Sequence, residues 1–220
     1  MDSIFVAGAS GHAKVIIDII EKEGRYSIAG LLDGTKEAGT PFLGYPVLGK
    51  EEELERLARK HHIIGGIVAI GDNWIRKQVA ARIHALFPAC RFVRAVHPAA
   101  SVGKGVEIGA GSAVMAGAVL GPDTRVGEHC IVNTGATLDH DGILEDFSSL
   151  APGVAAGGNV NIGELTAVAI GAVIVHRIRI GKNCVIGAGS TVLDDIPALS
   201  VAYGTPARVV RTRSPGDPYL

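Results

Sequence analysis

The stretch VGKGVE-IGAGSA-VMAGAV-LGPDTR-VGEHCI, residues 102–131, repeats every six residues, and this period decides the fold. Each hexad starts with an aliphatic residue, and the pattern runs on to Val192, so that sixteen successive hexads keep it with only Ala156 small. Four residues after most of these starts comes a small or β-branched side chain. A period of six fits neither an α-helix nor an alternating strand.

The repeat predicts a triangular solenoid in which three hexads close one coil of 18 residues. We expect the aliphatic residue to point into the prism and the small residue to turn the corner. Glycine often follows the aliphatic residue, as at Gly109 and Gly163, where it permits a tight turn. Because such a prism is narrow, it is expected to gain further burial by assembling around a symmetry axis.

The residues before the repeat alternate between strand and helix patterns. Strands are expected at 4–7, 28–32, 67–70 and 91–93, and helices at 13–23, 51–60 and 74–86. The first helix is expected to bury Val15, Ile16, Ile19 and Ile20. This alternation predicts a small parallel sheet with βαβ crossovers. We therefore expect an α/β Rossmann-like domain at 1–96, an all-β parallel β-helix at 97–199 and a C-terminal tail at 200–220.

Composition excludes several classes of protein. The formal net charge is −1, which gives no electrostatic case for nucleic acid or an anionic membrane as a partner. No apolar stretch approaches the roughly 18 residues that span a bilayer. The 3 cysteines form no CxxC pair, which fits a reducing cytoplasm without disulfides or zinc fingers. We expect a cytoplasmic protein.

A glycine turn connects the first strand to the first helix, with the sequence GASGHAK at residues 8–14. Free N–H groups at such a helix start can hold a phosphate. Ser10 replaces the second glycine of GxGxxG, which disfavours a dinucleotide cofactor. Asp33 ends the next strand, where its carboxylate could accept from a ribose or sugar hydroxyl, and Gly71 ends a third. Together these residues predict a nucleotide-sugar pocket.

The strongest catalytic candidate is His140, in the sequence NTGATLDHD at 133–141. Leu138 is the inward residue of its hexad, so His140 is expected to project outward, toward a neighbouring subunit. An imidazole suits proton abstraction near neutral pH, and the adjacent Asp141 could fix its tautomer and raise its basicity.

Several motifs agree in order and spacing with one known family. GASGHAK, LLD at 31–33, AIGDN at 69–73, the hexad repeat and GTPAR at 204–208 resemble the sialic-acid-acetyltransferase-like sugar acyltransferases. That family of hexapeptide-repeat acyltransferases includes the N-acetyltransferases of nucleotide-linked 4-amino sugars. The resemblance extends to about residue 211. It implies a left-handed β-helix, a homotrimer with active sites at subunit interfaces, and acetyl-CoA in the groove between subunits.

The resemblance also implies roles for individual residues. His140 would be the general base and Asp141 its support. The substrate contacts would be Ser10, Gly11, His12, Asp33, Gly34, Gly71 and Asn133. The acetyl-CoA contacts would be Ser149, Gly158, Ile170, His176, Ala188 and Pro206. Ser149 departs from the family pattern, which often has a second histidine there.

His176 follows His140 by 36 residues, which is two coils, and Gly158 lies between them in the same column. The glycine is expected to leave open space in a strip that forms part of the acetyl-CoA groove. A solvated pair of His176 and Arg177 is an equally good interpretation. Asn159, in the column of Asp141, is expected to hydrogen-bond that carboxylate.

The resemblance, taken with the His140–Asp141 pair, implies an acetyl-CoA-dependent N-acetyltransferase that acts on the 4-amino group of a nucleotide-linked 4-amino-4,6-dideoxy sugar, and we expect direct transfer in a ternary complex. The alternative enzyme is a sialic acid O-acetyltransferase. A metal enzyme on the same prism is disfavoured, because His140 and His176 are too far apart to share one ion, and no metal site is expected. A non-catalytic nucleotide sensor is the remaining class.

Overall fold

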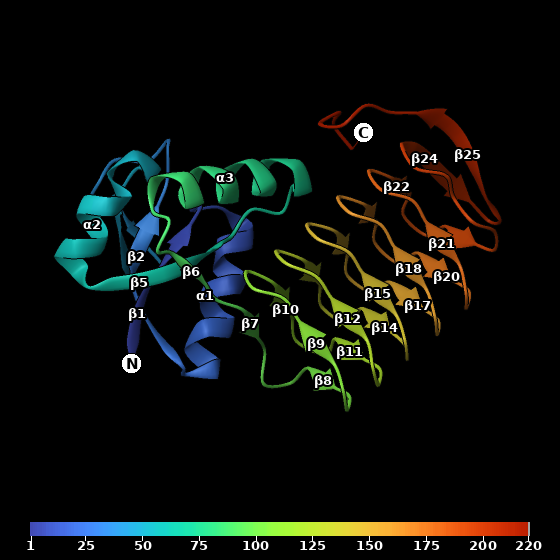
Figure 1. Ribbon diagram of the computed structural model, residues 1–220, viewed down its shortest axis with the longest axis horizontal. Coiled ribbons are helices and arrows are strands. Elements are labelled where there is room, and N and C mark those ends of the chain that lie inside the picture. The colour runs from blue at the N-terminus through green and yellow to red at the C-terminus, as the bar shows by residue number, and fades with distance from the viewer. Residues whose placement is uncertain (220) are drawn as a thin grey trace. The chain divides into compact units, whose positions relative to one another are not determined.

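The computed structural model describes residues 1–219 and divides them into two compact units, Met1–Pro98 and a second from Ala99 onward. Each unit has its own arrangement of strands (Figure 1). The first is an α/β layer structure, and the second is a left-handed β-helix.

The first unit is built on a six-stranded sheet with the order β3-β4-β2-β1-β5-β6. Its strands are β1 (Asp2–Ala7), β2 (Tyr26–Leu32), β3 (Pro41–Phe42), β4 (Tyr45–Gly49), β5 (Ile63–Val68) and β6 (Arg91–Phe92). The other elements are α1 (Gly11–Glu23), the 3₁₀ turn η1 (Glu51–Glu53), α2 (Leu54–His61), α3 (Asn73–Leu86) and β7 (Ala95–Val96). β1 pairs in parallel with both β2 and β5, which confirms the predicted Rossmann-like core.

Helix α1 packs against this sheet through a face slightly rotated from the predicted one. Ile16, Ile17, Ile19 and Ile20 are buried, whereas Val15 is exposed, so the expectation for Val15 was wrong. The i, i+3, i+4 spacing is met by the four isoleucines, and this leaves Val15 on the solvent side. The helix ends at Gly24, which adopts φ 64°.

The hairpin of β3 and β4 was not predicted from the sequence. Its turn contains Leu43 and Gly44, both with positive φ. β4 then extends the sheet by pairing in parallel with β2. Pro46 and the 2-residue length of β3 obscure the alternating pattern of a strand. The hairpin depends on pairing with β2 rather than on local propensity.

The second unit winds 2-residue strands into a three-sided prism, which confirms the interpretation of the six-residue period (Figure 1). We name each side after the first of its strands within this unit. The β8 face comprises β8 (Ser101–Val102), β11 (Val119–Leu120), β14 (Thr137–Leu138), β17 (Ala155–Ala156), β20 (Val173–Ile174) and β23 (Thr191–Val192). The β9 face comprises β9 (Glu107–Ile108), β12 (Arg125–Val126), β15 (Ile143–Leu144), β18 (Asn161–Ile162) and β21 (Arg179–Ile180). The β10 face comprises β10 (Ala113–Val114), β13 (Ile131–Val132), β16 (Ser149–Leu150), β19 (Ala167–Val168), β22 (Val185–Ile186) and β24 (Ser200–Gly204), which pairs with β25 (Ala207–Thr212).

The two repeating columns both point into the prism. The aliphatic starts are buried from Val114 to Val192, and the small residues that follow four positions later are buried as well, including Ser112, Thr124 and Cys130. The glycine after the aliphatic residue was expected to permit a tight turn, but the structure gives a different reason for it. A Cβ on Gly109 would lie 2.5 Å from the backbone of Gly127, so glycine is needed there for close stacking of coils.

Three corners connect the faces, and each contains one residue with positive φ per coil. We call the corner after the β8 face the histidine corner; there the positive-φ residues are Asp123, Asp141, Asn159 and Arg177, after Gly105. We call the corner before the β8 face the glycine corner, because its positive-φ residues are Gly117, Gly135, Gly153, Gly171 and Gly189. The β8 face therefore lies between these two edges.

Burial of the aliphatic column predicts the effect of shortening it. Val168→Ala removes two methyl groups from a side chain that is 1% exposed and should lower the free energy of unfolding by about 2 kcal/mol. Val102 occupies the same column in the first coil but is 44% exposed, so Val102→Ala should cost less than about 0.5 kcal/mol. Denaturant unfolding of the two variants measures the difference, and equal costs would contradict the assignment of the column to the core.

Candidate active site

His140 lies at the histidine corner, two residues after the end of β14, and its side chain projects outward with about half of its surface exposed. Its Nδ1 lies 2.8 Å from Oδ2 of Asp141. The backbone holds both residues: the N–H of Asp141 donates to the carbonyl of Pro122, and the carbonyl of His140 accepts from Asn159 N–H. The predicted pair of imidazole and carboxylate is therefore present.

The hydrogen bond to Asp141 raises the pKa of the His140 imidazole above its ordinary value, and the charges of Asp139 and Asp141 act in the same direction. An ionised carboxylate only accepts, so Nδ1 carries the hydrogen in the neutral ring. Nε2 then holds the free lone pair. This arrangement can remove a proton at Nε2 and stabilise the imidazolium that results.

Gly158 lies one coil beyond His140 in the same column. The expected open space at Gly158 is taken by the His140 ring, because a Cβ on Gly158 would lie 2.4 Å from Nε2. His176 is exposed one coil further on, beside the exposed Arg177. The expected hydrogen bond between Asn159 and Asp141 is not among those of the described residues; the positive φ of Asn159 turns its backbone toward His140 instead.

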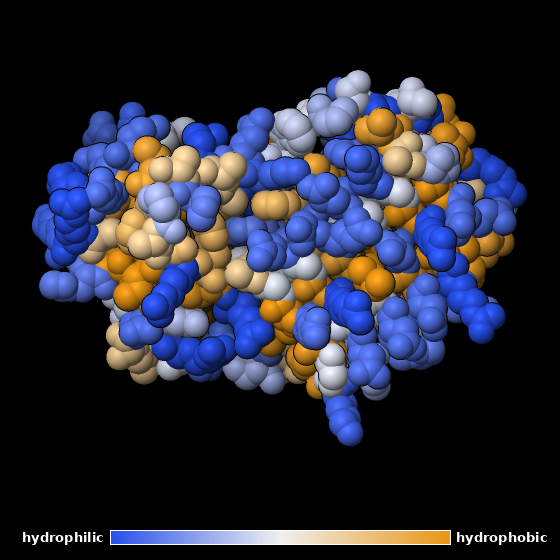
Figure 2. All heavy atoms as spheres, in the orientation of Figure 1, coloured by the Kyte–Doolittle hydropathy of each residue, from blue (hydrophilic) through white to orange (hydrophobic). Residues whose placement is uncertain are grey.

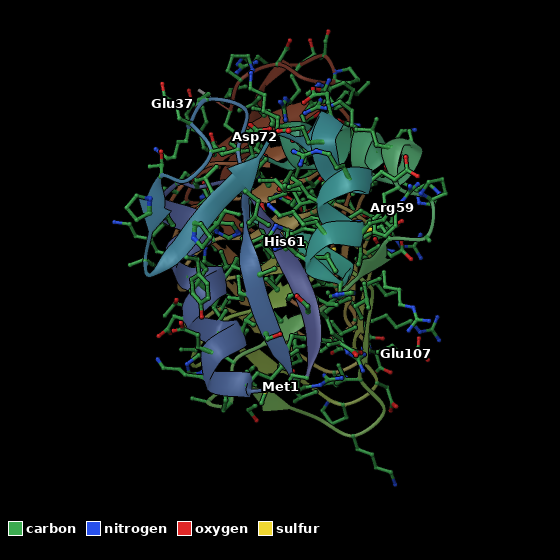
Figure 3. All side chains as sticks on the ribbon, turned by 90° about the vertical axis from the view of Figure 1, so that its left-hand side faces the viewer. Met1, Glu37, Arg59, His61, Asp72 and Glu107 are labelled. Carbon is green, nitrogen blue, oxygen red and sulfur yellow. The ribbon has the colours of Figure 1, made fainter. Side chains whose placement is uncertain are left out.

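The predicted nucleotide residues lie at the carboxyl ends of β1, β2 and β5, in the first unit. Figure 3 shows Asp72, after β5, and Glu37, after β2, at the end of the sheet away from Met1. Ser10 precedes α1 without a side-chain hydrogen bond to the helix, and no acidic residue lies in the first turn. The first N–H groups of α1 are thus left for another acceptor, and the helix dipole favours an anion there. Gly11 adds open space, since a Cβ would meet no atom within 4 Å.

Asp33 is more occupied than the sequence indicated. Oδ2 accepts from Ala9 N–H at 2.9 Å, and Oδ1 accepts from Thr35 and from Lys36 N–H. Burial acts to raise the pKa of this carboxyl, but these hydrogen bonds outweigh it and lower the pKa. Oδ2 therefore links the loop after β2 to the loop after β1, and Oδ1 holds the loop after β2 in shape. Gly34 and Gly71 lie in the open beside them.

Arg76 is a member of this region that sequence reasoning missed. It is 1% exposed, and its guanidinium donates to the carbonyls of Ile70 and Gly71 and to Asn73 Oδ1. Burial and the charge of Arg76 lower the pKa of His12 to about 4, so His12 is neutral at pH 7. Nε2 of His12 is buried without a hydrogen-bond partner among the described residues. A charged residue in a helix pattern is normally solvated, so only the fold could reveal this one.

The predicted acetyl-CoA contacts lie at more than one edge of the prism. Gly158 and His176 are at the histidine corner with His140. Ile170 and Ala188 are at the glycine corner, where Gly189 N–H donates to the Ile170 carbonyl. Pro206 follows Thr205, whose Oγ1 lies 3.5 Å from the Gly189 carbonyl, and Ser149 is half-buried on the β10 face.

Asn133 precedes the glycine corner and is separated from His140 by β14. One chain therefore does not bring Asn133, Ile170, Ala188 or Pro206 to the side chain of His140. Across residues 1–219, no three His, Cys, Asp or Glu side chains are placed to hold a metal ion together. No helix in that range is long and apolar enough to cross a membrane.

Known proteins resemble this chain in both sequence and structure. Residues 3–83 match the family model described as PglD N-terminal domain. The structure is similar to that of a mutant GDP-perosamine N-acetyltransferase from Caulobacter crescentus in complex with CoA and GDP-perosamine, with a TM-score of 0.90 and 33% identity over 96% of this chain and 98% of that one. The chain belongs to the family of nucleotide-linked amino-sugar N-acetyltransferases.

Two further relatives support this membership. The acetyltransferase domain of PglB from Neisseria gonorrhoeae FA1090 gives a TM-score of 0.86 at 32% identity, over 96% of this chain and 100% of that one. The UDP-N-acetylbacillosamine N-acetyltransferase of Bacillus subtilis is 35% identical over 119 residues, which cover 53% of this chain and 52% of that protein. The chain spans about half the length or less of the first curated relatives it matches. For example, the match covers 41% of a serine acetyltransferase of Synechococcus elongatus.

The neutral state of His12 predicts how stability depends on pH. Above about pH 6.5 the histidine is neutral in both the folded and the unfolded chain, so its full contribution is present. As the pH falls toward 4, only the unfolded chain takes up the proton, and the free energy of unfolding should drop by about 2 kcal/mol between about pH 7.5 and about pH 5. Urea unfolding at the two pH values measures this drop.

His12→Gln should remove this part of the pH dependence, and His84→Gln, at an exposed site on α3, is the matched control. An unchanged pH dependence in the His12 variant would show that His12 is not held neutral in the folded protein.

Proposed function

We propose that this protein transfers the acetyl group of acetyl-CoA to the 4-amino group of a nucleotide-linked 4-amino-4,6-dideoxy sugar, in the cytoplasm. The observation that carries the proposal is the His140–Asp141 pair on the outer edge of the β-helix. It occurs in a chain similar over nearly its whole length to an N-acetyltransferase bound to CoA and GDP-perosamine.

The chemistry follows from the geometry of the pair. The sugar amine must be unprotonated to attack, so its ammonium first gives one proton to solvent. The nitrogen then bonds to the thioester carbonyl carbon, and Nε2 of His140 takes a second proton from that nitrogen. The C–S bond breaks as the carbonyl re-forms, and the proton passes from His140 to the leaving sulfur. The products are the N-acetylated sugar and CoA thiol, formed by direct transfer.

The first unit supplies the features that a nucleotide diphosphate needs. Ser10 and Gly11 leave the N-terminus of α1 open to an anion, and the buried guanidinium of Arg76 adds positive potential in the same region, as its effect on the pKa of His12 shows. We assign to Asp33 a role in positioning the loop of Ala9 and Ser10, in place of a direct contact with a hydroxyl.

We propose that three copies of the chain assemble around an axis, with the active sites at the interfaces. The support is the separation of the predicted contacts onto two edges of one prism, because a second copy can bring the glycine corner of one chain to the histidine corner of another. The outward residues of the β8 face carry no charge: Ser101, Val119, Thr137, Ala155, Val173 and Thr191. By contrast, the β9 face exposes Glu107, Arg125 and Arg179. Figure 2 shows apolar side chains at the surface among the hydrophilic ones.

A charge on the β8 face should separate the trimer. Val173 is 43% exposed in the single chain, so Val173→Arg should leave the fold intact while placing a desolvated charge in the interface. Light scattering coupled to size exclusion should show loss of the three-chain species, and acetyl transfer should fall with it. Asn161→Arg, on the β9 face, is the matched control and should stay assembled. A trimeric and active Val173→Arg would contradict the proposed interface.

The activity itself is tested by release of CoA thiol. UDP-, GDP- and dTDP-linked 4-amino-4,6-dideoxy sugars, and free sialic acid, are offered with acetyl-CoA to the wild type and to His140→Ala. We expect turnover with an amino sugar, lowered on the order of 10²–10⁴-fold in the variant, since a general base contributes about that factor. Turnover with sialic acid and with no amino sugar would show that the enzyme is an O-acetyltransferase and would contradict the proposed N-acetylation. Full activity in His140→Ala would show that His140 is not the general base.

A further inference from the structure

Gly158 stands out within its column at the histidine corner. Successive coils place Lys104, Pro122, His140, Gly158 and His176 at this position. The backbone of the column therefore accepts large side chains, and the φ of Gly158 is not in the left-handed region. Neither the fold nor the turn requires glycine in this coil.

The His140 imidazole explains the glycine. An ideal Cβ on Gly158 would lie 2.4 Å from Nε2 of His140, 2.6 Å from Cε1 and 2.9 Å from Cδ2. Real Cβ atoms essentially never come this close, so any side chain at 158 must displace the ring. The atom nearest to that Cβ is also the nitrogen that holds the free lone pair.

The backbone prevents the two residues from moving apart. The carbonyl of His140 accepts from Asn159 N–H at 2.9 Å, and the carbonyl of Gly158 accepts from Arg177 N–H at 2.9 Å. These bonds set the distance between successive coils. A side chain at 158 would therefore be accommodated by rotation of the His140 ring, which would break its 2.8 Å contact with Asp141.

We infer that Gly158 is a positioning residue of the active site: its missing side chain gives the His140 ring its seat and leaves Nε2 open to the acceptor amine. This inference rests on the proposed acetyl transfer, and it replaces the simpler view of Gly158 as open space in a cofactor groove. Asp141 holds Nδ1 of the ring, and the absence of a side chain at Gly158 leaves Nε2 accessible to the acceptor amine.

A double-mutant cycle on kcat tests this inference. Gly158→Ala should lower kcat on the order of 10²–10⁴-fold, to the level of His140→Ala, because the same base is lost. In the His140→Ala background, adding Gly158→Ala should change the residual rate by less than about twofold, because residues that act through one group are not additive. A wild-type rate in Gly158→Ala, or an equal loss in both backgrounds, would overturn the inference.

Stability supplies a second readout that does not depend on turnover. Gly158→Ala should destabilise the chain in the wild-type background, where it meets the ring, and have little effect in the His140→Ala background, where the space is free. Lys104→Ala, in the same column and exposed, is the matched control and should remain stable and active. Equal destabilisation in the two backgrounds would show that the alanine disturbs the coil itself.

The ionisation of His140 separates failure of this inference from failure of the proposed function. In an NMR titration, Gly158→Ala should shift the pKa of His140 down toward about 6.5, because the contact with Asp141 is lost. An unchanged pKa of His140 would overturn the positioning role. A wild-type protein that is inactive on every acceptor would contradict the proposed acetyl transfer. The titration would still show whether Gly158 positions the His140 ring.

Discussion

The structure of the second unit depends on one backbone hydrogen bond that recurs at successive corners from Asp123 to Gly189. The positive-φ residue donates its N–H to the carbonyl 19 positions earlier, as Asp141 does to Pro122, Phe147 to Glu128 and Gly153 to Thr134. With the parallel pairing of the short strands, this bond locks each coil to the one before it in a register of 18 residues. Every residue therefore has a fixed neighbour above and below, and a column on the surface is as well defined as a column in the core.

That register makes a precise site possible on an exposed corner of the prism. His140 is half exposed, yet three features limit its ring: the carboxylate of Asp141, the glycine in the next coil and the backbone bond from Asn159. Side chains on a fixed repeat need little further support, because the scaffold does not adjust between coils. The same regularity separates the glycine corner from the histidine corner within one chain, and this separation is the reason for proposing that another copy completes the site.

The repeat was predictable because two columns of residues, the aliphatic starts and the small residues four positions later, keep the same six-residue period through sixteen hexads. The outward direction of His140 and its pairing with Asp141 followed from that register. Features that depend on tertiary neighbours did not follow. The β3–β4 hairpin forms because β2 offers an edge for pairing. Asp33 accepts hydrogen bonds from N–H groups of two loops. Arg76 is buried at the end of the sheet, which the residue pattern of its own helix does not indicate. The choice of Ile17 over Val15 on α1 depended on a small rotation of the helix that the spacing alone leaves open.

The identity of Asp141 shows how the fold and the proposed chemistry share one requirement. Every corner needs a residue with positive φ, which costs most side chains about 1 kcal/mol and is tolerated best by Gly, Asn and Asp. At the histidine corner this position directly follows the residue that projects outward. An aspartate there meets the backbone demand at small cost, and the left-handed turn, with φ 57°, is the conformation in which its carboxylate lies 2.8 Å from Nδ1 of the preceding histidine. A glycine would satisfy the turn equally well but would leave the imidazole without a partner, whereas aspartate satisfies both constraints.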